Sequence, residues 1–275
     1  MKLSLSVRAA EASTDKKSID IDPKTFIESA KTYGYAAVCM RASMLGTHSS
    51  REEVLQMRDL LDHVGLEVSM VTGDFAIPIN NERGPDCLRK ITPYLDLTEQ
   101  LRSSLIRVCI KDEKDIPHAQ RAADEAKERS IRLAHQCHTL SLFETVDGAI
   151  DVLTKIDRKN FGLIYEPGNL ALCGEDYGPG AIRKLAPYIF NVYLQNHVPE
   201  PDGKTVMHTW KMGKVLSTIY PLEAEAGIDF KTVVTGLCTV GYDGYITLHQ
   251  AFKGDAPPLE AAQRSAVFLR GLLES

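Results

Sequence analysis

The chain alternates short apolar runs with longer amphipathic, charged stretches, and this alternation repeats eight times. Helical patterns between the runs favour parallel strands joined by crossover helices. Eight such units predict an α/β fold whose parallel sheet closes into a (β/α)₈ barrel. The candidate strands cover about residues 2–7, 35–40, 66–71, 105–110, 131–136, 161–165, 190–195 and 245–249.

The length of 275 residues suits one such barrel, which needs about 250. No shift in composition marks a second domain, so residues 1–275 are expected to form a single TIM barrel domain. A net charge of −5 argues against a nucleic-acid partner. No apolar run is long enough to span a membrane, and the first residues lack a signal-peptide pattern. We therefore expect a cytoplasmic protein with reduced cysteines.

Local signals set the boundaries of several elements. Asp22-Pro23 predicts the start of a helix, and Ser50 with Glu53 forms a capping-box pattern for the next helix, which Gly65 ends. The connection from Gln195 to Asp229 is unusually long and carries the only tryptophan. Because it leaves the end of the seventh strand, we expect it to cover the barrel mouth as a partial lid.

Four of the apolar runs end in polar side chains that could hold a metal ion. In a parallel barrel the carboxyl ends of the strands meet at one face, where such enzymes place their chemistry. Nitrogen and oxygen donors from four strands therefore indicate a divalent-metal site at the mouth. The segments are His135-Gln136-Cys137-His138, Tyr165-Glu166-Pro167-Gly168-Asn169, Gln195-Asn196-His197 and His249-Gln250.

The segment 226–249 carries a Gly-Ile-Asp-Phe motif, an amphipathic stretch, Gly-Tyr-Asp-Gly and a final strand. It resembles the last βα unit of the sugar phosphate isomerase/epimerase superfamily, the xylose-isomerase-like TIM barrels. The resemblance extends over nearly the whole chain. It implies a metal held by Glu, Asp, His and Glu at the ends of strands five to eight. This chain departs from that set, with Gln136, Glu166, Tyr193 and His249 at the matching positions.

The resemblance and the donors together predict a metal site with one carboxylate. Gln195 and His197 share a face of the seventh strand, so either could replace the histidine of the family. Imidazole and amide donors favour manganese, with zinc, cobalt, iron or magnesium as alternatives. A barrel that has lost its metal is the competing interpretation. The predicted metal ligands are Gln136, Glu166, Gln195 and His249.

A carboxamide cannot accept a proton as a base, so Gln136 cannot serve as one of the two glutamates of the family epimerases. Nearby imidazoles are the alternative bases around neutral pH. The predicted catalytic residues are His135, His138 and His197. The predicted substrate-binding residues are Arg41, Asn169 and Lys211. Glu144 is expected to favour a helix start, and Asp176 to cap the helix that follows it. No Walker or dinucleotide-binding motif is present, which argues against a nucleotide cofactor.

The first functional hypothesis is a metal-dependent isomerase or epimerase of sugars or keto-sugars that acts through an enediolate. The second is a carbon–oxygen or carbon–carbon lyase that cleaves 3-oxo-glycosides by elimination. Such a lyase is similar to C-glycoside deglycosidase subunits. Those subunits pair a histidine with the strand-five ligand, and His135 and Gln136 could form the same pair. The third is a non-catalytic carbohydrate-binding subunit. In each case the partner is a small sugar, and assembly into a homo-oligomer is left open.

Overall fold

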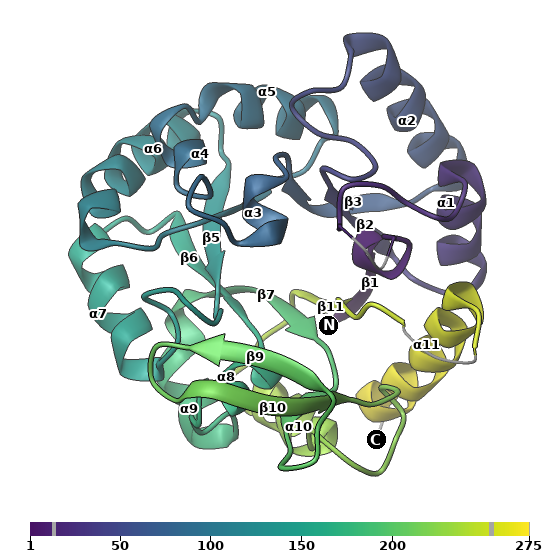
Figure 1. The fold of residues 1–275 in the computed structure, drawn as a ribbon. Helices are drawn as coiled ribbons and strands as arrows, with labels where there is room; N and C mark the ends of the chain where they lie inside the picture. Colours follow the sequence, from purple (N-terminus) through teal and green to yellow (C-terminus); the bar gives the residue numbers. More distant parts are fainter. Residues whose placement is uncertain (13–14, 253–255, 275) are drawn as a thin grey trace.

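A computed structural model describes residues 1–12, 15–252 and 256–274. Eight parallel strands close into a barrel with helices around it (Figure 1), which confirms the predicted fold. Around the ring the order is β1-β11-β7-β6-β5-β4-β3-β2. The strands are β1 (Lys2–Ser6), β2 (Ala37–Arg41), β3 (Glu67–Thr72), β4 (Leu105–Val108), β5 (Arg132–Gln136), β6 (Phe161–Tyr165), β7 (Ile189–Leu194) and β11 (Tyr245–Leu248).

Helices occupy the intervals between the strands. The Asp22 carboxylate accepts the Thr25 N–H at the start of α1, and the Ser50–Glu53 capping box opens α2 as predicted. Gly65 ends α2 with a left-handed φ of 71°, which a glycine adopts without strain. The α-helices are α1 (Pro23–Thr32), α2 (Arg51–Val64), α3 (Ala76–Ile79), α4 (Asp86–Arg89), α5 (Thr92–Gln100), α6 (Ile116–Glu128), α7 (Val146–Ile156), α8 (Pro167–Leu172), α9 (Pro179–Leu185), α10 (Phe230–Thr239) and α11 (Pro258–Glu274). The 3₁₀ helices are η1 (Val7–Ala9), η2 (Glu113–Asp115) and η3 (Ala186–Tyr188).

Alternation along the strands decides which side chains fill the barrel and which face the helices. One buried cluster takes a single side chain from each of six strands, β2 to β7, and therefore marks the barrel interior. Side chains two residues further along the same strands face the same interior, at the carboxyl ends that form the barrel mouth. The cluster consists of Cys39, Met70, Leu105, Ala134, Ile164 and Tyr193.

The opposite strand faces pack against the helix layer to form the large core. On α1 the side chains of Phe26, Ile27 and Ala30 are fully buried, as their helical spacing predicts. Among the residues described, no helix combines the length and apolar character needed to cross a membrane.

The long connection after β7 is not the loop that its sequence suggested. It folds into a three-stranded antiparallel sheet of β8 (His197–Pro199), β10 (Gly213–Ile219) and β9 (Thr205–Thr209), in that order. The hairpin β9–β10, green in Figure 1, contacts segments that follow β5 and β6. The sheet therefore lies at the rim of the mouth, on the side where a partial lid was expected.

Glu144 holds this hairpin to the barrel. Its buried carboxylate accepts hydrogen bonds from the backbone N–H groups of Trp210, at 2.8 Å, and Lys211, at 3.0 Å. It also accepts the Leu140 N–H within its own loop. The helix start expected at Glu144 is provided by Thr145, whose hydroxyl caps α7. The carboxylate thus anchors the β9–β10 turn rather than a helix.

We expect Glu144→Ala to lower the free energy of unfolding by about 1–3 kcal/mol, because three N–H groups lose a charged acceptor. The hairpin should also become more mobile. Trp210 is the only tryptophan, so its fluorescence anisotropy reports on this turn directly. Glu260→Ala on the surface of α11 is the control, and the anisotropy should fall only in the Glu144 variant. Equal anisotropy in both variants would contradict the anchoring role.

Candidate functional site

Glu166, at the end of β6, lies at the centre of the polar side chains of the mouth. Its carboxylate is fully buried and accepts hydrogen bonds from the side-chain amides of Gln136 and Gln195. Asn169, one turn further along α8, donates a third hydrogen bond at 3.0 Å. The ends of β5, β6 and β7 therefore converge, and three of the predicted site residues contact a fourth, Glu166.

The environment of Glu166 changes its acidity. Burial raises the pKa of the Glu166 carboxyl to about 8, while the nearby Arg107 charge and the hydrogen bond from Gln195 oppose that rise. Lys16 opposes it as well, and its own pKa is lowered to about 8 by burial and by Arg8. A carboxyl group with this pKa can both take up and release a proton near neutral pH.

His249 follows β11 and extends into the same mouth. Its ring stacks on Tyr193, with a centroid distance of 3.8 Å and an angle of 6° between the planes. Its Nδ1 lies 3.0 Å from the Ser6 hydroxyl. Burial, followed by the charges of Arg41 and Arg107, holds the pKa of His249 well below its usual value. The imidazole is therefore neutral at pH 7 and available as a hydrogen-bonding or proton-accepting group.

The three histidines predicted as catalytic lie in other surroundings. His135 neighbours the inward-facing Ala134 on β5, so its ring faces the helix layer. There its Nδ1 lies 3.0 Å from the Val108 carbonyl oxygen, and its ring meets Phe143 edge-to-face at 4.6 Å. The structure thus places His135 outside the barrel interior. It does not bring His135 together with Glu166.

His138 and His197 are also engaged by neighbours. The Nδ1 atom of His138 lies 3.1 Å from the Asn80 amide and 2.8 Å from the Thr139 carbonyl oxygen. His197 lies on β8 in the small sheet, where its Nε2 is 2.8 Å from the Ser217 hydroxyl. The expectation that His197 shares the strand face of Gln195 fails, because β7 ends at Leu194 and the chain turns into β8.

Of the predicted substrate-binding cations, Arg41 faces the mouth and Lys211 does not. Arg41 is buried and pairs with Glu11, with 2.6 Å between its Nε and the carboxylate. Arg8 and Ser43 also donate to Glu11, so this carboxylate is saturated. Lys211 instead forms an ion pair with Glu175 on the rim.

The structure adds two residues that the sequence reasoning missed, Arg107 on β4 and Thr72 on β3. Both face the interior, two residues beyond Leu105 and Met70 of the interior cluster. Arg107 is only 3% exposed, its guanidinium carbon lies 5.9 Å from the centre of the Tyr193 ring, and no described residue accepts a hydrogen bond from it. The signal for Arg107 was a charged residue inside an apolar strand, Leu105–Val108.

The charges at the mouth do not fit a tightly bound divalent cation. Four cationic side chains act on His249, two of them also act on Glu166, and the Glu166 oxygens already accept three amide N–H groups. In the described ranges, no group of three or more His, Cys, Asp or Glu side chains is arranged to hold a metal ion. The cations are Arg8, Arg41, Arg107 and Lys16. The donor set predicted from the sequence thus lies within a positive field that opposes Mn²⁺ or Mg²⁺.

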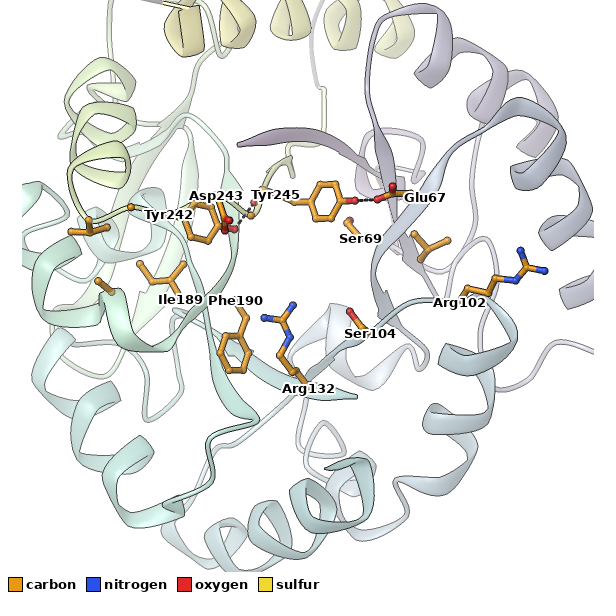
Figure 2. Close-up of a pocket in the computed structure, with 15 residues that line it drawn as sticks. Glu67, Ser69, Arg102, Ser104, Arg132, Ile189, Phe190, Tyr242, Asp243 and Tyr245 are labelled. Carbon is orange, nitrogen blue, oxygen red and sulfur yellow. Dashed lines mark hydrogen bonds between the residues drawn. The ribbon is translucent and has the colours of Figure 1, made fainter. Parts of the chain in front are cut away.

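A hollow of about 460 Å³ lies at the opposite end of the barrel, where the strands begin. Figure 2 shows side chains at the starts of β3, β5 and β11 around it, including Glu67, Arg132 and Tyr245. The Arg132 guanidinium lies 4.8 Å from the centre of the Phe190 ring, and the Tyr245 hydroxyl donates to Glu67. Barrel enzymes place their chemistry at the other end, so we assign the candidate active site to the mouth.

Comparisons with known proteins identify the family and the fold of the chain. A family model described as xylose isomerase-like TIM barrel matches residues 27–272. An inosose dehydratase from Geobacillus thermodenitrificans is 24% identical over 152 residues, or 54% of this chain. That match covers 51% of the relative, so the chain spans about half the length of the curated protein that it matches.

Two solved structures show the same fold at low sequence identity. D-psicose 3-epimerase from Clostridium cellulolyticum, solved with D-tagatose, is 15% identical, with a TM-score of 0.71 and 99% of each chain covered. A xylose isomerase-like TIM barrel protein from Mycobacterium smegmatis, in complex with magnesium, is 14% identical, with a TM-score of 0.72. That alignment covers 99% of this chain and 96% of the other. The relatives thus include an epimerase, a dehydratase and a metal-binding member.

The buried position of His135 predicts a pH-dependent stability. Burial lowers the pKa of His135 to about 3, so the unfolded state binds more protons than the folded state below pH 6.5. Stability should therefore fall as the pH drops from about 6.5 towards 3, by up to about 1.4 kcal/mol per pH unit from this residue.

His135→Asn keeps a donor for the Val108 carbonyl but does not titrate. Denaturant unfolding between pH 7 and pH 4 should give a flatter profile for this variant than for the wild type. His63→Asn, on the surface of α2, is the matched control and should leave the profile unchanged. A parallel profile in wild type and His135→Asn would show that His135 is protonated in the folded state.

Proposed function

This chain belongs to the xylose isomerase-like TIM barrel family, and we propose that it is an enzyme that enolises a keto-carbohydrate bound at the barrel mouth. Its relatives act on small carbohydrates, as the names inosose dehydratase and D-psicose 3-epimerase state. Both kinds of reaction can begin with removal of a proton from the carbon next to a carbonyl group. The proposal is that this chain carries out the same first step.

The observation that carries the proposal is the Glu166 carboxyl group. It is fully buried at the end of β6, three amides orient it, and burial raises its pKa to about 8. A catalytic base works best when its pKa lies near the working pH, because it then both accepts and returns a proton readily. Perturbed carboxyl groups of this kind cluster at active sites.

In the proposed reaction the ionised Glu166 carboxylate takes the α-proton. The C–H bond breaks, its electron pair forms a C=C bond, and the carbonyl oxygen becomes an enolate oxyanion. The positive side chains of the mouth stabilise that oxyanion, with Arg107 foremost. In elimination the enolate electrons re-form the carbonyl and expel a β-hydroxyl group. This group leaves as water with the proton held by Glu166, and the product is an unsaturated ketone.

One carboxylate base at the mouth, in place of two, favours elimination over epimerisation. Epimerisation removes a proton from one face of the sugar and returns it to the other, which the family does with two glutamates. Here Glu11 is saturated by two arginines and Ser43, whereas Glu166 accepts only neutral amides and has no ion pair among the described residues. A dehydratase-type lyase is therefore the leading proposal. An isomerase that moves the proton to the neighbouring carbon is the second, since it also needs one base.

The metal-dependent form of this chemistry, expected from the sequence, receives less support. Solved members of the family include one in complex with magnesium. In this chain the positive charges near His249 and the hydrogen bonds on Glu166 argue against the same arrangement. The role of an electrophile is assigned here to the guanidinium groups.

Deuterium exchange tests the proposed first step. Keto-carbohydrates such as inosose, D-psicose and D-tagatose are incubated with the protein in D₂O and followed by NMR. We expect uptake of deuterium at the α-carbon of at least one substrate. Glu166→Gln should slow this exchange by about 10²–10⁴-fold, the usual contribution of a positioned base. Because the ionised form is the base, the rate should rise with pH up to about 8.

Asp176→Asn is the matched control, since its carboxylate at the rim only accepts backbone N–H groups at the start of α9. It should exchange at the wild-type rate. Exchange that persists in Glu166→Gln at the wild-type rate would assign the base to another group, with His249 as the next candidate.

A further inference from the structure

We propose that the side chains at the ends of β2, β3, β4 and β5 form a binding site for the anionic group of a carbohydrate acid. The inference deepens the proposed function, on which it rests, by assigning the substrate class. Its group of residues, called the unpaired arc below, holds four buried polar atoms that lack a hydrogen-bond partner among the described residues. They are Arg41 Nη1, Thr72 Oγ1, Arg107 Nε and Gln136 Oε1.

The unpaired arc is continuous in space. The four strands are consecutive neighbours in the barrel, and Arg41 pairs directly with Thr72 in the β2–β3 register. Val71 and Ile106 are partners one residue earlier, which places Thr72 beside Arg107. All four residues lie two positions beyond members of the interior cluster, so their side chains face the same space.

Unpartnered polar atoms are costly inside a protein, and native structures contain few of them. Seven are found in the described part of this chain, and four of these lie in the unpaired arc. Without a common cause, such buried atoms would be spread through the barrel and the helix layer. Their concentration at the catalytic end of the barrel indicates that a ligand supplies the missing partners.

The chemistry of the unpaired arc defines that ligand. Two guanidinium nitrogens donate and belong to positively charged groups, and the Thr72 hydroxyl can donate beside them. The free oxygen of Gln136 can only accept, and its amide N–H is already used on Glu166. Donors of this kind match the oxygens of a carboxylate or phosphate, and the acceptor matches a sugar hydroxyl. The ligand is therefore an anionic polyol.

The two arginines differ in whether a carboxylate neutralises their charge. Glu11 neutralises the charge of Arg41 and leaves only its Nη1 atom without a hydrogen-bond partner among the described residues. Arg107 has no ion pair in the described structure, and Glu166, whose charge acts on it, accepts hydrogen bonds from amides. A buried guanidinium without a partner is unfavourable until an anion enters. Arg107 is therefore the main determinant of anion binding.

Calorimetric titration with three probes tests this site. Glucuronate carries a carboxylate, glucose 6-phosphate carries a phosphate, and glucose is neutral. We expect at least one anionic probe to bind the wild type and glucose to bind much more weakly. Arg107→Met should weaken binding of the anionic probe by about 10- to 100-fold, the contribution of charge-assisted hydrogen bonds. Whichever anionic probe binds identifies carboxylate or phosphate as the preferred group.

Arg132→Met is the matched control. Arg132 belongs to the hollow at the other end of the barrel (Figure 2) and should leave anion affinity unchanged. Arg107→Lys, which keeps the charge but loses the planar fork, should bind with intermediate affinity. If Arg107→Met fails to fold, the Lys variant alone carries the comparison. The ligand-free Met variant should melt no lower than the wild type, because it removes an unpaired buried charge.

The proposal is overturned if neither anionic probe binds at millimolar concentration, or if glucose binds as tightly as they do. It is also overturned if Arg132→Met, and not Arg107→Met, loses the binding. Deuterium exchange keeps this result apart from the proposed function. Arg107-dependent binding of an anionic probe without exchange on any keto-carbohydrate would support the anion site and contradict the enolising enzyme. Exchange on a keto-carbohydrate, with neither anionic probe bound, would do the reverse.

Discussion

Closing eight parallel strands into a barrel forces every second side chain of each strand into one shared interior. Near the middle of the barrel this chain fills the space with Met70, Ile164, Tyr193 and smaller side chains. Two residues further along the strands the inward-facing positions are charged or polar. The side chains of Arg41, Arg107 and Glu166 therefore face the same interior. The barrel therefore holds opposite charges at close range, and the acidity of each group follows from the closure.

This closure also explains which parts of the molecule the sequence could predict. The strands and the contact of Gln136 with Glu166 follow from local patterns, because strand ends converge in any parallel barrel. Side chains along a strand alternate between its two faces, so the outward position of His135 could be predicted from the inward position of Gln136. His197 could not be placed, because the order of β8, β10 and β9 depends on pairing between residues far apart in the chain.

Arg107 was missed for a different reason. The resemblance to the family points to the ends of strands five to eight, where the family holds its metal. The unpaired arc begins on β5 and extends through β4 and β3 to β2, and so reaches into the other half of the ring. A single arginine inside an apolar strand is a weak local signal, and only the fold shows that its guanidinium faces the interior without a partner. The number of missing hydrogen bonds is a property of the packed molecule and cannot be counted from sequence.

The arginines and the amide-bound carboxylate give one consistent electrostatic account of the mouth. A metal ion in such a barrel supplies positive charge to a substrate oxygen, and it requires several anionic ligands to stay in place. Gln136 and His249 stand where the family has glutamates, so this mouth carries less negative charge. The buried Arg107 adds a fixed positive charge in place of the metal ion. A guanidinium needs no ligand set, because the chain itself holds it over Tyr193. Glu166 is left as a fully buried carboxyl without an ion pair among the described residues, and burial raises the pKa of such a carboxyl towards neutrality. The departures from the family pattern at β5, β6 and β11 are thus coupled to the arginine on β4 through the charge balance of a single enclosed space.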